Sequence, residues 1–283
     1  MIPNQLKTVI LLGLLSGLLL GVGVLVGGIQ GLTIALFFAI AINFFSYWYS
    51  DKIVLRIYKA QPVKENDNLY SIVQEVASMA GIPMPKVYLI PSEHPNAFAT
   101  GRNPEHAAVA CTKGIVEMMN NDELKGIVAH EISHIKNRDI LISSIAATIA
   151  AVIGYVAMMA RWAAIFGGMG NRDSDGGGMM ELLVLAIVTP LMATIIQLAI
   201  SRSREFQADE SAAKILHNPY GLANALEKLE SGIKKKPLRA QASTEATSHM
   251  FILNPFSGRG MFKLFTTHPP VSERVKRLKS MTV

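Results

Sequence analysis

Four apolar runs set the first constraint on this chain, because each is about as long as a helix that crosses a bilayer. They extend over residues 9–28, 32–49, 140–160 and 182–200. A helix rises about 1.5 Å per residue, so about 20 apolar residues span the hydrocarbon layer. Half of all residues are hydrophobic, more than is usual for a soluble domain. We therefore expect a membrane region of four helices arranged as two hairpins.

The first run has an apolar core longer than that of a secretory signal, and a second run follows almost at once. We expect a retained anchor. Gly13, Gly17 and Gly21 recur every four residues, which places them on one helical face that a neighbouring helix could approach closely. The sequence therefore predicts a tight hairpin between the first two runs.

Basic residues indicate the orientation, because cytoplasmic flanks of membrane helices carry an excess of them. They flank both predicted hairpins on the side of the polar segments: Lys7, Lys52, Arg56, Lys59, Lys136, Arg138, Arg202 and Arg204. We expect both termini and the polar segments on the cytoplasmic side of the membrane. The net charge of +6 lies next to apolar runs, which favours lipid headgroups over nucleic acid as its partner.

The chain divides into a first transmembrane hairpin (1–50), a polar segment (51–139), a second hairpin (140–200) and a second polar segment (201–283). Neither polar segment alone is comfortably large enough for its own core. Because the second hairpin leaves and returns at one membrane face, we expect the two polar segments to form one domain. The one cysteine, Cys111, excludes an internal disulfide.

Within the first polar segment the pattern predicts an amphipathic helix and three short strands. These are a helix over 68–79, ended by Gly81, and strands over 86–90, 97–101 and 106–112. Asn120 and Glu123 have the spacing of a capping box, which predicts a helix from there to Asn137.

That last helix carries His130-Glu131-Ile132-Ser133-His134, the H-E-x-x-H pattern. A spacing of four residues puts both imidazoles on one helical face, where they can bind one Zn²⁺ ion. Glu131 reaches the edge of that face, where a carboxylate can take a proton from a metal-activated water. Such a pattern also arises by chance on ordinary surface helices, so its surroundings decide.

Glu205 lies just beyond the fourth apolar run, and the motif helix ends just before the third. The hairpin arrangement makes these ends neighbours, so Glu205 is the candidate third ligand. Three protein ligands leave one position open, as in catalytic zinc sites. Asp209, one turn after Glu205, is the candidate acceptor for the second N–H of a ligand histidine.

These residues resemble the family of HtpX-type membrane zinc proteases, which includes the CAAX prenyl proteases and the Oma-type mitochondrial proteases. The likeness covers nearly the whole chain. It rests on the H-E-x-x-H pattern, on Ser203-Arg204-Glu205-Phe206-Gln207-Ala208-Asp209, on Asn96-Ala97-Phe98-Ala99-Thr100-Gly101, and on Thr267-His268-Pro269-Pro270 followed by Arg274.

The resemblance implies a mainly α protein: four transmembrane helices with a cytosolic α+β gluzincin-type metalloprotease domain that carries a small sheet. It implies one Zn²⁺ per subunit in a bacterial inner-membrane endopeptidase that cleaves misfolded or damaged membrane proteins, with other quality-control proteases as potential partners. By the same resemblance His268 or Arg274 stabilises the oxyanion. The segment Asn96, Ala97, Phe98 and Ala99 then binds substrate as an edge strand, although it could equally be a plain structural strand.

Three other interpretations remain. An intramembrane protease is disfavoured because charged residues bracket the motif helix. A non-enzymatic membrane scaffold would tolerate the loss of Glu131. Prenyl-protein processing would need a chamber enclosed by more than four helices.

Overall fold

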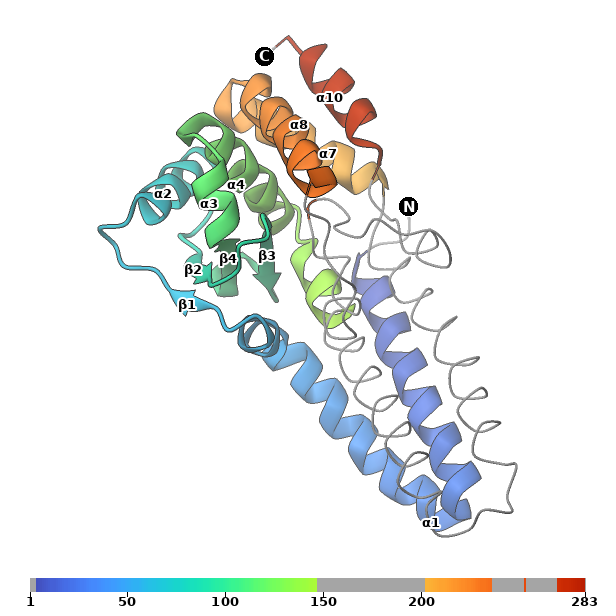
Figure 1. The fold of residues 1–283 in the computed structure, drawn as a ribbon. Helices are drawn as coiled ribbons and strands as arrows, with labels where there is room; N and C mark the ends of the chain where they lie inside the picture. Colours follow the sequence, from blue (N-terminus) through green and yellow to red (C-terminus); the bar gives the residue numbers. More distant parts are fainter. Residues whose placement is uncertain (1–3, 147–201, 236–251, 253–268, 283) are drawn as a thin grey trace.

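A computed structural model describes residues 4–146, 202–235, 252 and 269–282 (Figure 1). In this part of the chain a long helical hairpin, α1, leads into a domain of helices packed around a small mixed sheet. The predicted mainly helical architecture with a small sheet is confirmed for these residues.

The helix α1 (Asn4–Ile57) reverses direction near Gly28, whose φ of +55° favours glycine. Its two legs approach closely at Gly23 and Gly31, where a Cβ on Gly31 would overlap the carbonyl oxygen of Gly23. Further along, the amide of Asn43 donates to the hydroxyl of Ser16 at 2.7 Å. The predicted tight hairpin is therefore present.

The glycines predicted to face the second leg lie elsewhere. A Cβ built on Gly13, Gly17 or Gly21 meets no atom of the described residues within 4 Å, and all three are exposed. The close approach is made nearer the bend, by Gly23 and Gly31, because the two legs are nearest there. The four-residue repeat therefore predicted the wrong helical face for the contact between the two legs.

Of the described residues, one helical stretch, Gly28–Ile57, is long and apolar enough to cross a membrane, and the first run contributes a shorter apolar helix, Leu12–Gly21. Only the start of the third run, residues 140–146, is described, and the fourth run lies outside the described residues. Ile140, Ile142 and Ile145 are almost fully buried. The third run therefore begins inside the protein, and four membrane helices remain a prediction.

The sheet has the strand order β1-β2-β4-β3. Its strands are β1 (Gln61–Pro62), β2 (Lys86–Ile90), β3 (Ala97–Gly101) and β4 (Ala107–Thr112). The three predicted strands are confirmed, whereas β1 and the parallel pairing of β2 with β4 were not predicted. β3 pairs antiparallel with β4 and forms the edge of the sheet.

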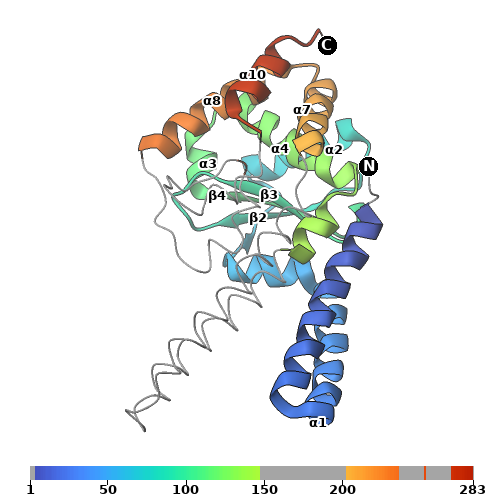
Figure 2. The same ribbon diagram turned by 90° about the vertical axis from the view of Figure 1, so that its right-hand side faces the viewer.

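Each face of the sheet is covered by helices (Figure 2). On one side α2 (Asn68–Ala80) and α4 (Asn121–Lys136) enclose the main apolar core. On the other side the end of α1 packs against the sheet, with Tyr58 stacked 5.2 Å from the Phe98 ring. The helical hairpin α1 is therefore joined directly to the sheet.

Two predicted helix boundaries are confirmed. α2 ends at Gly81, which adopts a left-handed conformation, and α4 begins with the capping box of Asn120 and Glu123. The chain between them also forms the 3₁₀ helix η1 (Pro104–His106) and the short helix α3 (Lys113–Met118).

Helices from the second polar segment pack on α4. They are α7 (Arg202–Leu216) and α8 (Pro219–Lys235), and α10 (Val271–Lys279) lies against both. Gly126 of α4 lets the backbone of Leu222 on α8 come close, because a Cβ there would lie 2.5 Å from the Leu222 nitrogen. The two polar segments thus share one core.

Candidate metal centre

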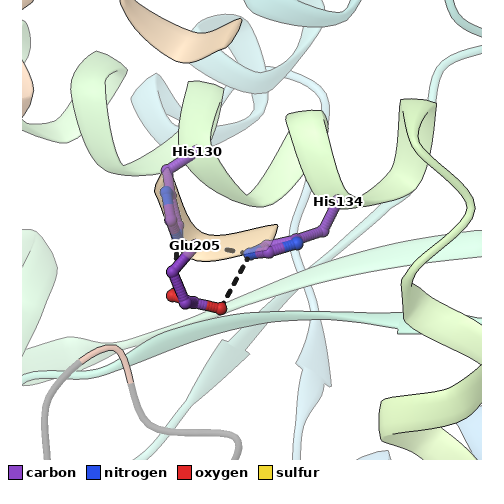
Figure 3. A group of neighbouring side chains, drawn as sticks. All are labelled: His130, His134 and Glu205. Atoms are coloured by element: carbon purple, nitrogen blue, oxygen red, sulfur yellow. Dashed lines mark hydrogen bonds and ion pairs between the residues drawn. The ribbon is translucent and has the colours of Figure 1, made fainter. Parts of the chain in front are cut away.

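Two helices bring three potential metal ligands together. His130 and His134 lie one turn apart on α4, and Glu205 lies in the first turn of α7; their side chains point toward one another (Figure 3). The two Nε2 atoms are 3.3 Å apart. Each lies 3.6 Å from an oxygen of the Glu205 carboxylate.

These separations fit a zinc ion. Ligand atoms placed about 2.0–2.1 Å from a tetrahedral metal are about 3.3 Å from one another. The donor set, two imidazoles and one carboxylate, is also that of a catalytic site rather than a thiolate-rich structural site. The three residues present therefore suit Zn²⁺.

A buried ion pair between Asp209 and Arg274 orients the His130 ring through its Nδ1 atom. Its Nδ1 lies 2.9 Å from Oδ1 of Asp209. Arg274 of α10 donates hydrogen bonds to the same carboxylate from Nε at 2.8 Å and from Nη2 at 2.6 Å. A carboxylate on Nδ1 keeps the proton there and leaves the Nε2 lone pair for a metal. The Asp209 position predicted from the sequence is thus next to His130.

His134 has a carboxylate of its own, which the sequence reasoning missed. Asp139 follows α4, and its Oδ2 lies 3.3 Å from Nδ1 of His134. The signal available in the sequence was an acidic residue just after the helix that carries His134, five residues beyond that histidine. Because both Nδ1 atoms face carboxylates, both Nε2 atoms are free to point at one centre.

Electrostatics reflect this arrangement. Although burial lowers the pKa of His130, hydrogen bonds to Asp209 and Glu205 outweigh it and raise the pKa to about 9 in the metal-free protein. The pKa of Asp209 is lowered because Arg274 and His130 outweigh the opposing effect of burial. A cation such as Zn²⁺ would take the place of the proton on His130.

Glu131 is buried beside the two histidines, and its Oε2 accepts a hydrogen bond from the Ala99 amide at 2.9 Å. Burial raises its pKa, and the charge of Glu205 acts in the same direction, while the histidines and the Ala99 amide oppose this. Glu131 thus joins the H-E-x-x-H motif to the edge strand β3, and its raised pKa suits a candidate general base.

The side chains of the predicted substrate-binding segment lie on opposite faces of the sheet. Ala97 and Ala99 face the core that contains α4, whereas Phe98 packs against the end of α1 on the opposite face. Asn96 is buried, and its backbone N–H donates to Thr112 Oγ1 at 2.9 Å. Its side-chain oxygen accepts from the Ile252 amide at 3.2 Å.

Of the two predicted oxyanion candidates, His268 lies outside the described residues. Arg274 is fully buried and committed to Asp209, with Nη1 3.4 Å from the Ile252 carbonyl oxygen. Its Nη2 lies 3.5 Å from His130 Nδ1. These contacts place Arg274 behind the ligand histidine.

A solved structure has a similar fold. It is described as the crystal structure of S. mikatae Ste24p and matches with a TM-score of 0.52 at 20% identity. The match covers 94% of this chain but 62% of that one, so this chain spans less than two thirds of the yeast protein's length.

Sequence comparisons are more specific. A protein described as "Protease HtpX homolog" from Desulfatibacillum aliphaticivorans is 54% identical over 97% of this chain and 89% of its own length. The homolog of the same description from Syntrophobacter fumaroxidans is 51% identical over 98% of this chain and 99% of its own. The model of peptidase family M48 matches residues 63–282. The chain therefore belongs to peptidase family M48 and is a metalloprotease similar to the HtpX proteases along nearly its whole length.

Proposed function

We propose that this protein is a zinc-dependent membrane endopeptidase that hydrolyses peptide bonds of misfolded or damaged membrane proteins. One Zn²⁺ per subunit is held by His130, His134 and Glu205. The observation that carries this proposal is the convergence of both Nε2 atoms and the Glu205 carboxylate at separations of 3.3 and 3.6 Å.

A Zn²⁺ ion held by His130, His134 and Glu205 would polarise the scissile carbonyl and lower the pKa of a water molecule toward about 7. Glu131 takes a proton from the attacking water and passes it to the leaving amine. Burial and the neighbouring Glu205 raise its pKa toward the range in which a carboxylate can both accept and release a proton. Asp209 and Arg274 hold His130 in the tautomer that presents Nε2.

The Arg274 guanidinium is engaged by Asp209, which favours a positioning role for Arg274 over that of an oxyanion donor. His268 is then the stronger of the two candidates for the oxyanion. Ala97 and Ala99 lie on the edge strand β3 and are the candidates for pairing with an extended substrate; the Ala99 N–H already donates to Glu131, so a substrate would pair with other backbone groups of this strand.

The membrane part of the proposal places the enzyme in a cell (inner) membrane with four crossings and a cytoplasmic active site. The polar segments 51–139 and 201–283 form one metalloprotease domain at the membrane surface. The Arg102 guanidinium lies 4.6 Å from the ring of Trp48, at the end of the second apolar run. Aromatic residues favour the headgroup level, which supports a domain seated against the bilayer.

The first experiment compares wild type with Glu131→Gln, purified in detergent without chelators. Zinc content is measured beside cleavage of an unfolded membrane protein. We expect both proteins to hold one zinc and the variant to lose at least about 100-fold in turnover, as general-base removal does. Glu210→Gln, an exposed acid on α7 paired with Lys214, is the matched control.

This proposal would be wrong if the wild-type protein held no zinc or if the Glu131→Gln variant cleaved the substrate equally well. Either result would favour the interpretation of the protein as a non-enzymatic membrane scaffold. A substrate panel that includes soluble unfolded proteins tests the preference for membrane proteins separately. Equal turnover of both classes would remove that preference while leaving the zinc mechanism in place.

A further inference from the structure

The turn that ends α4 adopts a strained conformation. Arg138 has a φ of +57°, in the left-handed region. A residue other than glycine adopts that region at a cost of about 1 kcal/mol or more. The turn directs the Asp139 amide back onto the carbonyl oxygen of His134 at 2.9 Å. Such strain persists where the surrounding structure fixes it, and here it brings Asp139 beside a metal ligand.

Asp139 connects two parts of the site. Its Oδ2 lies 3.3 Å from Nδ1 of His134, and its Oδ1 lies 3.7 Å from Nη1 of Arg204. Asp139 and Arg204 are both buried, with exposed fractions of 5% and 7%, respectively. Removing two charges from water costs free energy that their mutual attraction need not repay, so stability alone does not account for this pair. Arg204 directly precedes the ligand Glu205 in the chain.

The position of this pair in the chain is informative. The apolar segment 140–201 begins directly after Asp139 and ends directly before α7, which starts at Arg202. Its first turns also hold the edge strand: Ser144 Oγ accepts from the Gly101 amide at 3.2 Å and lies 2.7 Å from Thr100 Oγ1. The first turns of the segment and the residues that flank it, Asp139 and Arg204, are therefore built into the site.

We propose that Asp139 and Arg204 are a positioning pair for the metal centre. Asp139 holds the His134 imidazole with Nε2 toward the metal, and Arg204 holds Asp139. The contact between these two residues thereby fixes the relative positions of His134 and Glu205. This inference rests on the proposed zinc site and extends it to residues that no ligand pattern identified.

The geometry also ranks the two histidine supports. The Nδ1 atom of His130 lies 2.9 Å from Asp209, whereas the Nδ1 atom of His134 lies 3.3 Å from Asp139. The side chain of His134 is 16% exposed and that of His130 is 3% exposed. The contact of Asp139 with His134 is therefore the longer and the more exposed of the two.

Zinc affinity tests the proposal by chelator competition on the full-length protein in detergent. We expect Asp139→Asn to weaken zinc binding about 10- to 100-fold, the usual effect of removing the acceptor behind a ligand histidine. Arg204→Gln should weaken it less, and Arg204→Lys should restore most of the loss. The double variant Asp139→Asn/Arg204→Gln should bind no more weakly than Asp139→Asn, because Arg204 acts through Asp139.

The absorption spectrum of the Co²⁺-loaded protein provides a readout of ligand geometry that general destabilisation does not move. Asp139→Asn and Arg204→Gln should alter the visible bands, and the control Glu210→Gln should leave both bands and affinity unchanged. Thermal unfolding of the metal-free proteins verifies their fold, with Asp139→Glu as the second variant should Asp139→Asn unfold.

Two results would overturn the pair. One is wild-type zinc affinity and Co²⁺ spectrum in Asp139→Asn. The other is an Arg204→Gln variant that lowers the unfolding temperature alone. His130→Ala separates this failure from that of the zinc site: if wild type and His130→Ala bind zinc equally, the ligand assignment fails, whereas a defect in His130→Ala alone leaves the site intact and rejects only the pair.

Discussion

Asp209 faces Nδ1 of His130 at 2.9 Å, and the same carboxylate forms a two-bond ion pair with a fully buried arginine of the last helix. The contact joins His130 on α4, a proposed metal ligand, to an acidic residue on α7 and a basic residue on α10. Residues that are far apart in the chain therefore set one imidazole's tautomer.

Arg274→Ala should destabilise the protein by about 3–5 kcal/mol, because it leaves the buried Asp209 carboxylate without its main partner. Thermal or denaturant unfolding of the metal-free protein measures this. Arg277→Ala is the matched control, since Arg277 lies one turn further along α10 and is more than half exposed. Equal stability of the two variants would show that the pair contributes little.

Asp209→Asn should weaken zinc binding about 10- to 100-fold while retaining the side chain's volume. An asparagine cannot supply the negative charge that favours a proton on Nδ1 of His130. Isothermal titration or chelator competition measures the affinity. Unchanged affinity in a folded variant would contradict the role assigned to Asp209.

Zinc binding should strengthen as the pH rises toward 9. The pKa of His130 is raised to about 9, so below that pH the metal-free site carries a proton that zinc must displace. Each unit of pH below 9 then costs up to about tenfold in apparent affinity. Chelator competition between pH 6 and 9.5 measures this, and a pH-independent affinity would contradict it.

The same raised pKa predicts how the stability of the metal-free protein changes. Protonated His130 stabilises the folded state fully below its ordinary pKa of 6.5, and this contribution is lost as the pH rises through about 9. In Asp209→Asn the loss should occur at lower pH, because a main cause of the raised pKa is gone. Unfolding curves across this range compare the two proteins.

The elements that sequence reasoning predicted well are those with local signals. The capping box of Asn120 and Glu123 and the glycine after α2 mark helix ends through bonds within a few residues. The strands alternate or run apolar between turn residues, and their bounds agree closely with the structure. Local chemistry suffices for such boundaries.

What the sequence did not reveal depends on contacts between distant segments. The role of Asp139 follows from a left-handed turn at Arg138, a conformation that an arginine does not signal. The partner of Arg274 lies 65 residues away on another helix. The glycine face was misassigned because a four-residue repeat defines a face of one helix, whereas the contact depends on where the hairpin bends.

Gly126→Ala should destabilise the domain by about 1–3 kcal/mol, the usual cost of overpacking. A Cβ there would lie 2.5 Å from the backbone nitrogen of Leu222, which cannot move without shifting α8. Gly232→Ala on α8 is the control, because the added methyl meets only the flexible end of Met118. A smaller loss of unfolding temperature in Gly126→Ala than in Gly232→Ala would contradict this close packing.

Cys111 should not react with a maleimide in the folded protein. Its side chain is fully buried on β4, and burial together with the charge of Glu131 raises the pKa of the thiol far above its usual range. The thiolate is the reactive form, so labelling should require denaturation.

The native chain thus provides an unreactive background for cysteines introduced one at a time at residues 165–178, outside the described part of the chain. The four-helix topology predicts that a membrane-impermeant maleimide labels them from the side opposite to the termini; labelling from the cytoplasmic side would show that the segment 140–200 does not cross the membrane as a hairpin.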